Sequence, residues 1–204
     1  MKLVVVSAGL SVPSSTRLLA DRLTDAVREK LADQDHKVDV DVIELRALAV
    51  AIANNLVTGF PPPQLATTIE TVTGADGLIA VTPVFSASYS GLFKSFFDLI
   101  DPDALTGKPV LIAATGGTAR HSLVLEHALR PLFAYLRAVA VPTAVYAASE
   151  DWGSGSDAHT QGLSARIRRA GGEMASLMTA RATDEAPDDD STSFQRQLSD
   201  LRFS

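Results

Sequence analysis

Residues 3–18 read LVVVSAGLSVPSSTRL, and this stretch decides how the rest of the chain is interpreted. It opens with four apolar residues, Leu3 to Val6, a run typical of a short strand buried on both faces. A hydroxyl-rich loop follows, and from Ser15 onward apolar residues recur at helical spacing. Together these segments predict an anion site, because the free N–H groups and the dipole of a helix N-terminus favour a phosphate.

The charge in the first helical turn also fits a phosphate. A first turn usually carries Asp or Glu, but here the first acid is Asp21 and the turn carries Arg17. Arginine has the wrong sign for the helix dipole and the right sign for a phosphate. The alternative is that Ser14 or Ser15 merely caps the helix and the other hydroxyls are solvated. The loop matches neither GxGxxG nor GxxxxGK[ST], which disfavours a Rossmann dinucleotide site and a P-loop.

Composition narrows the class of protein. A chain of 204 residues fits one α/β domain, and its net charge of −6 argues against a surface for nucleic acid or anionic membranes. The absence of cysteine excludes disulfides, iron–sulfur clusters and thiol catalysis, and the four histidines lack zinc-type spacing. No stretch approaches the roughly 20 apolar residues of a membrane span, and the first apolar run is too short for a signal peptide. We expect a cytoplasmic protein with no metal site that binds neither nucleic acid nor membrane.

Four further strands are predicted. Valine and aspartate alternate over residues 38–42, which indicates an edge strand with one face in water. Residues 78–81 and 110–114 are continuously apolar and predict central strands. Residues 139–146 contain Pro142, and an internal proline belongs in an edge strand. Helices are predicted at about residues 15–32, 46–56, 64–73, 92–100, 122–136 and 163–180.

The edges decide the topology. With the second and fifth strands outside, a flavodoxin-like order 2-1-3-4-5 fits, whereas the Rossmann order 3-2-1-4-5 would expose the apolar run 78–81. We therefore predict a three-layer α/β sandwich around a five-stranded parallel sheet. Ligands of such sheets bind at the carboxyl ends of the strands, at the switch point between strands 1 and 3. The loops at residues 7–17, 82–91 and 115–121 follow strands 1, 3 and 4, so they are predicted to converge on one site.

These segments resemble the NAD(P)H-dependent FMN reductases. The resemblance is closest to the branch that supplies reduced flavin to two-component, luciferase-like flavin monooxygenases. It rests on SVPSSTRLLADRL from Ser11, TPVFSASYSGLFKSFFDLID at 82–101 and ATGGTARHSLVLEHALRPLFAYLRA at 114–138. It covers Met1 to about Ala180, so we predict a flavodoxin-like FMN reductase domain over residues 1–181. Residues 182–204 are predicted to form an acidic, mobile tail.

The resemblance also implies the site residues. Those that would hold the FMN phosphate are Ser11, Ser15, Thr16 and Arg17. Those that would border the isoalloxazine ring are Pro83, Val84, Phe85 and Ser86, and those that would contact its pyrimidine end are Thr115, Gly116 and Gly117. Small residues suit this role, because they let backbone donors and acceptors approach a flat ring. Alone, Pro83 would be only a strand end and the two glycines only a turn.

The expected chemistry needs no catalytic side chain. Hydride passes from nicotinamide C4 to flavin N5 when the rings stack, so the protein contributes positioning and electrostatics. The cofactors implied are FMN with NADPH or NADH; a site for the 2′-phosphate of NADPH would come from Arg17, Arg120 or Arg137 of a neighbouring subunit. The resemblance further implies that FMN is an exchangeable substrate, released in reduced form to a flavin-dependent monooxygenase.

Two apolar helices predict self-association. The helix at 92–100 is apolar nearly all round, which indicates deep core or a subunit interface, and with the helix at 123–136 it predicts a homodimer or homotetramer. Tyr89 and His127 are expected at this interface. The alternative functions are a flavodoxin-like electron carrier, a quinone or azo reductase on the same fold, and a flavin-free interaction module.

Overall fold

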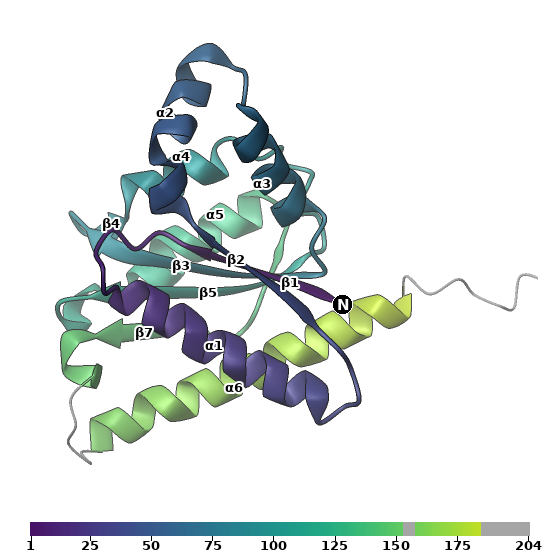
Figure 1. The fold of residues 1–204 in the computed structure, drawn as a ribbon. Coiled ribbons are helices and arrows are strands. Elements are labelled where there is room, and N and C mark those ends of the chain that lie inside the picture. The colour runs from purple at the N-terminus through teal and green to yellow at the C-terminus, as the bar shows by residue number, and fades with distance from the viewer. Residues whose placement is uncertain (153–157, 185–204) are drawn as a thin grey trace, which may run out of the picture.

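The computed structural model describes residues 1–152 and 158–184. A sheet runs through its middle in the order β2-β1-β3-β5-β6, with all neighbours parallel (Figure 1). These strands are β1 (Lys2–Ser7), β2 (Asp39–Glu44), β3 (Gly77–Phe85), β5 (Pro109–Gly116) and β6 (Val139–Ala140). In addition, β7 (Val145–Ala148) is parallel to β5, and β4 (Ser88–Tyr89) is antiparallel to β3. The predicted order 2-1-3-4-5 is confirmed, with the fifth predicted strand divided into β6 and β7.

Pro142 explains this division. It lies between β6 and β7. Because proline has no backbone N–H, it cannot donate a hydrogen bond to the neighbouring strand. Both short strands pair with β5 at the edge of the sheet. At the other edge β2 is only partly buried along its length, as its alternating sequence predicts.

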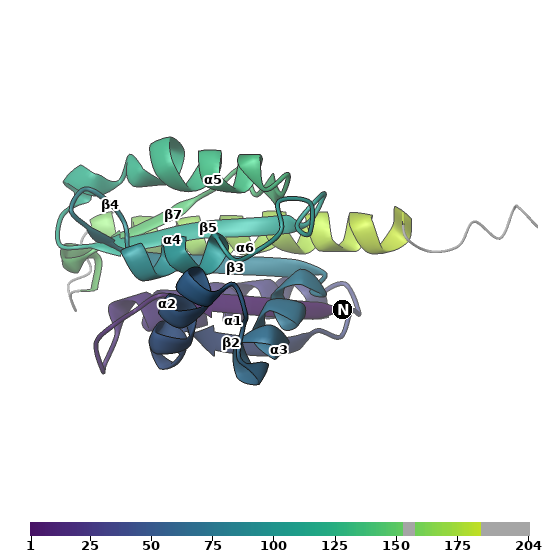
Figure 2. The same cartoon turned by 90° about the horizontal axis from the view of Figure 1, so that it is seen from above.

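Helices cover both faces of the sheet (Figures 1 and 2). On one face lie α1 (Ser15–Ala32) and α6 (Ala158–Asp184), which form a core with Leu3 and Val5 of β1. The helices on the opposite face are α2 (Ala49–Thr58), α3 (Pro63–Thr73), α4 (Gly91–Phe97) and α5 (Arg130–Tyr135). They pack on Val4 and Val6. Successive side chains of β1 therefore point to opposite faces of the sheet and belong to two separate cores.

The phenylalanines of α4 belong to the core of their own chain. Phe93, Phe96 and Phe97 are buried, and the ring centroids of Phe97 and Phe133 are 4.9 Å apart. Edge-to-face packing of this kind adds about 0.5–1.5 kcal/mol beyond the burial of area. Of the two interpretations of this apolar helix, deep core therefore holds for its aromatic side chains.

The segment from Thr82 to Gly91, predicted as a loop, begins as strand. β3 continues to Phe85 and turns back through Ser86 and Ala87 into β4. The φ angles of Ser86 and Ala87 are +46° and +67°, the left-handed conformation that a two-residue hairpin requires. Glycine or asparagine usually marks such a turn, and their absence hid the hairpin from the sequence.

The helix predicted at 122–136 is not regular. It consists of a π-helical turn, η3 (Leu125–Leu129), followed by α5. Pro131 is the physical reason, because it has no N–H to donate to the carbonyl of His127 four residues earlier. The backbone therefore changes its hydrogen-bonding register just before the proline.

The last helix is longer than predicted. α6 begins at Ala158 rather than Leu163 and continues to Asp184, past the expected domain boundary at residue 181. Residues 153–157 of the expected Gly/Ser/Asp loop and residues 185–204 of the expected tail lie outside the described residues. Among the helices of the described ranges, none combines the length and apolar character needed to cross a membrane.

Candidate functional site

A cavity of about 830 Å³ lies where the central strands end, and we call it the strand-end cavity. The loop after β1 and the carboxyl ends of β3 and β5 all line it, so the three segments predicted to converge do meet at one cavity. The predicted flavin-site residues that line it are Ser11, Ser15, Thr16, Pro83, Val84, Phe85, Thr115, Gly116 and Gly117. Arg17 and Ser86 are not among the lining residues.

The loop after β1 positions the start of α1. Ser14 is the N-cap, and its Oγ accepts a hydrogen bond from the backbone N–H of Arg17 at 3.2 Å. A Cβ on Gly9 would overlap with this oxygen, so the glycine permits the cap. Ser11 and Ser15 remain exposed in the cavity. Capping therefore accounts for Ser14 and leaves other hydroxyls available to an anion.

A buried hydrogen bond joins the first turn of α1 to the end of β5, where Thr115, Gly116 and Gly117 form what we call the glycine loop. The Oγ1 atoms of Thr16 and Thr115 are 2.8 Å apart, and both residues are at least 97% buried. An unpaired hydroxyl would be costly at this depth, so the pair fixes the spacing of two walls of the cavity.

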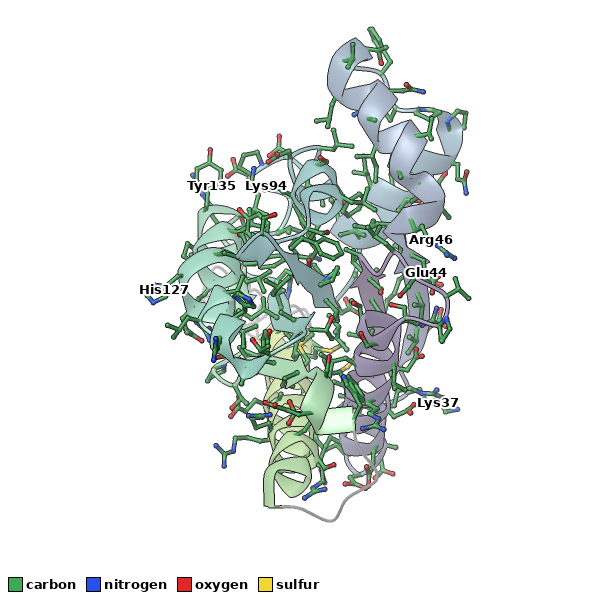
Figure 3. All side chains as sticks on the ribbon, turned by 90° about the vertical axis from the view of Figure 1, so that its left-hand side faces the viewer. Lys37, Glu44, Arg46, Lys94, His127 and Tyr135 are labelled. Carbon is green, nitrogen blue, oxygen red and sulfur yellow. The ribbon has the colours of Figure 1, made fainter. Side chains whose placement is uncertain are left out.

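The side chain of Arg17 is held by two carboxylates. Its Nε donates to Asp21 at 2.7 Å and its Nη1 to Glu44 at 2.9 Å. The hydrogen bond to Asp21 is the main reason that the pKa of Arg17 is raised, and Glu44 adds to the rise. Glu44 lies at the end of β2, on the right in Figure 3. Both carboxylates therefore hold the guanidinium, and the contact of Arg17 with the FMN phosphate stays a prediction.

The carboxyl end of β3 forms another wall of the cavity. Phe85 is 48% exposed and faces the cavity, whereas Ser86 occupies the tight turn beyond it. Thr82 supports the hairpin from beneath: its Oγ1 accepts from the N–H of Ser90 at 3.0 Å and donates to the carbonyl of Pro83. Rigid support of this kind suits a wall that must border a planar ring.

Sequence reasoning missed Tyr146, which supports the glycine loop. Its hydroxyl donates to the carbonyl of Thr118 at 2.9 Å and occupies the space that a Cβ on Gly116 would need. Burial raises the pKa of Tyr146, and the carboxylate of Asp151 adds to the rise. The phenol therefore stays protonated as a donor. Nothing in the sequence around Tyr146 signals this role.

Trp152, which also lines the strand-end cavity, was missed as well. It is the one tryptophan of the chain and follows the last strand of the sheet, where ligands of this topology bind. The position of this tryptophan in the sequence could therefore have identified it as a candidate ligand-binding residue.

A second cavity of about 710 Å³, the α4–α5 cavity, lies on one helical face. Its lining includes Tyr89, Lys94, His127 and Tyr135, three of which are labelled on the left of Figure 3. Tyr135 in this lining is 73% exposed, and Leu123, whose carbonyl accepts a hydrogen bond from the N–H of His127, is 63% exposed. Neither cavity holds a group of three or more potential metal ligands within the described residues.

Comparison with known proteins identifies the family. A family model described as NADPH-dependent FMN reductase matches residues 1–153. The chain belongs to this family. The FMN reductase (NADPH) of Pseudomonas aeruginosa is 40% identical over 181 residues, which cover 89% of this chain and 94% of that protein. The NADH-dependent FMN reductase SfnF of Pseudomonas fluorescens is 38% identical over 177 residues, which cover 87% and 91%.

Solved structures agree with the fold. An oxidoreductase from Corynebacterium diphtheriae matches with a TM-score of 0.84 at 48% identity, covering 88% of this chain and 97% of that chain. An archaeal flavodoxin matches with a TM-score of 0.57 at 15% identity, covering 88% and 99%. The latter likeness shows the fold alone, and it confirms the predicted flavodoxin-like architecture.

The strand-end cavity of this FMN reductase family member fits FMN on physical grounds. Exposed hydroxyls at a helix N-terminus suit a phosphate. A Cβ on Gly117 would meet no atom within 4 Å, so the glycine leaves open space beside the backbone. FMN, when bound, supplies an N5 that accepts hydride.

Proposed function

We propose that this protein is an NAD(P)H-dependent FMN reductase that transfers hydride from NADPH or NADH to FMN. The observation that carries the proposal is the buried Thr16–Thr115 hydrogen bond, which joins an anion-binding helix start to a glycine loop in one cavity. FMN needs both parts. A phosphate site alone has no place for the flat isoalloxazine ring, and a glycine turn alone has no site for the phosphate.

Each wall has one task in this proposal. Ser11, Ser15 and Thr16 bind the phosphate together with the N–H groups at the start of α1. The second wall consists of Pro83, Val84 and Phe85 with Ser86 behind them, and it borders the ring. Thr115, Gly116 and Gly117 present backbone groups to its pyrimidine end. Arg17 adds a nearby positive charge while it stays paired with Asp21 and Glu44.

Release of reduced FMN to a flavin-dependent monooxygenase is part of the proposal. An exchangeable flavin needs an accessible site, and the half-exposed Phe85 and Leu10 at the cavity fit that need. We also propose a cytoplasmic homodimer or homotetramer that associates through the α4–α5 face, where Leu123 and Tyr135 are exposed. Tyr89 and His127 line the cavity on this face.

Stopped-flow oxidation of NADPH and of NADH tests the function, with FMN, FAD and riboflavin in turn. We expect rapid oxidation that depends on added FMN, and a lower KM for FMN than for riboflavin. Turnover without free flavin but with quinones or azo dyes would favour a quinone or azo reductase. Tight FMN binding without turnover would favour an electron carrier, and no FMN binding at all would favour an interaction module.

A further inference from the structure

The strand-end cavity extends to an apolar surface that the proposed FMN contacts leave unused. Leu10, Leu18 and Trp152 all line the cavity, and we call these three residues the Trp152 shelf. Leu10 and Leu18 are 47% and 43% exposed. Exposed apolar side chains that line one cavity are typical of a ligand groove.

Helix α1 fixes one side of the shelf. Leu18 and Arg22 are four residues apart and therefore lie on the same face of the helix. The guanidinium carbon of Arg22 lies 5.0 Å from the centroid of the Trp152 ring, within the range of a cation–π contact. Trp152 thus packs along α1 beyond its first turn, past the place where the phosphate would bind.

Helix α6 fixes the segment that carries Trp152. This segment is the 3₁₀ turn η4 (Ser149–Trp152). The carboxylate of Asp151 accepts from the N–H of Ala148 at 2.7 Å and lies 3.9 Å from Nη2 of Arg166. Nη2 of Arg166 also donates to the carbonyl of Tyr146 at 3.3 Å. An aromatic ring held from two helices is a pre-organised stacking platform.

We propose that the Trp152 shelf binds the adenine ring of a dinucleotide. The inference rests on the proposed function, because an FMN phosphate at the start of α1 leaves the shelf just beyond it. FMN has no group to place there, whereas FAD and NAD(P)H both carry an adenosine. A planar base stacks on an indole face, and the cation of Arg22 on that ring adds an electrostatic attraction for an electron-rich purine. The volume of about 830 Å³ is near the upper end of ligand sites.

The fluorescence of the chain tests the shelf directly, because Trp152 is its one tryptophan. We expect AMP to quench this fluorescence in a saturable way, and ribose 5-phosphate, which lacks the base, to leave it unchanged. No quenching by AMP would overturn the shelf even if the protein reduces FMN. Saturable quenching without any FMN reduction would support the shelf and contradict only the proposed function.

Kinetics of Trp152→Leu identify the source of the adenine. If the adenine belongs to FAD, KM for FAD should rise about tenfold, while KM for FMN, which has no adenine, should stay close to the wild-type value. If it belongs to NAD(P)H, KM for the nucleotide should rise about tenfold at saturating FMN. Trp152→Phe, which keeps an aromatic face, should largely restore the lower value. An equal rise for all substrates, or none, would overturn the proposal.

A matched pair of variants tests the role of Arg22 as a positioning residue. We expect Arg22→Gln to weaken the quenching by AMP several-fold, because it removes the cation that holds the indole. Arg28→Gln removes another exposed arginine of the same helix and should leave the quenching unchanged. Equal quenching curves for both variants would exclude Arg22 from the shelf.

Discussion

The strand-end cavity and the α4–α5 cavity are of similar size, about 830 and 710 Å³, but they are built from different parts of the chain. The carboxyl ends of parallel strands and the loops beside them form the first cavity, and the register of the sheet fixes their spacing. Side chains on one helical face, such as Lys94 and Tyr135, form much of the second. Cavity volume alone would therefore not distinguish a site for flavin from a surface that binds a second copy of the chain.

The two cavities differ in how their lining residues are held in place. At the strand-end cavity, small residues expose backbone groups and buried partners such as Tyr146 hold them. At the α4–α5 cavity, exposed apolar side chains have more freedom and no glycine lies among the lining residues. We therefore expect substitutions in the first cavity to change FMN kinetics and those in the second to change assembly.

The largest effect is expected for Gly116→Ala. The added Cβ would overlap with the hydroxyl of Tyr146, so the glycine loop must shift. KM for FMN should rise by up to about a hundredfold, the upper range for forced overpacking. Adding Tyr146→Phe removes the obstructing oxygen and should recover part of the loss. A normal KM in the single variant would contradict the proposed role of the loop.

A smaller effect is expected for Thr16→Val. The change keeps the shape but leaves the buried hydroxyl of Thr115 without its partner, which costs about 1–3 kcal/mol of stability. KM for FMN should rise about tenfold, because the two loops lose their fixed spacing. Thr24→Val is the control for stability alone. Thr24 lies on the same helix, but its hydroxyl donates to the carbonyl of Ala20 within that helix, so KM for FMN should stay unchanged.

A still smaller effect is expected for Arg17→Ala. The sequence alone suggests a direct phosphate contact, but the guanidinium is engaged by Asp21 and Glu44. The two carboxylates offset its positive charge and solvent screens the rest, so the attraction for the phosphate is weak and KM for FMN should rise less than about fivefold. A rise of tenfold or more in steady-state assays would mean that Arg17 leaves these partners for the phosphate.

No effect on FMN kinetics is expected on the α4–α5 face. Leu123→Ser with Tyr135→Ser should shift the protein toward the monomer in light scattering, because both exposed apolar side chains are lost. KM for FMN should stay the same at concentrations where the variant is monomeric. A monomeric wild-type protein would contradict the proposed interface.

The sequence was sufficient wherever hydrophobic pattern sets the structure. The edge strands could be predicted from alternation and from Pro142, and the buried strands from continuous apolar runs. It was insufficient where the outcome depends on partners distant in the chain. Glu44 is 27 residues from Arg17, and Tyr146 reaches Thr118 across 28 residues. The hairpin at Ser86 was missed because its residues are not those that favour a left-handed turn.

A crystal structure of the FMN complex tests the central claim most directly. We expect the phosphate to lie beside Ser11, Ser15 and Thr16 at the start of α1. We expect the isoalloxazine ring to lie between Phe85 and the glycines that follow Thr115. Flavin in the α4–α5 cavity, or a phosphate outside the hydroxyl loop, would contradict it.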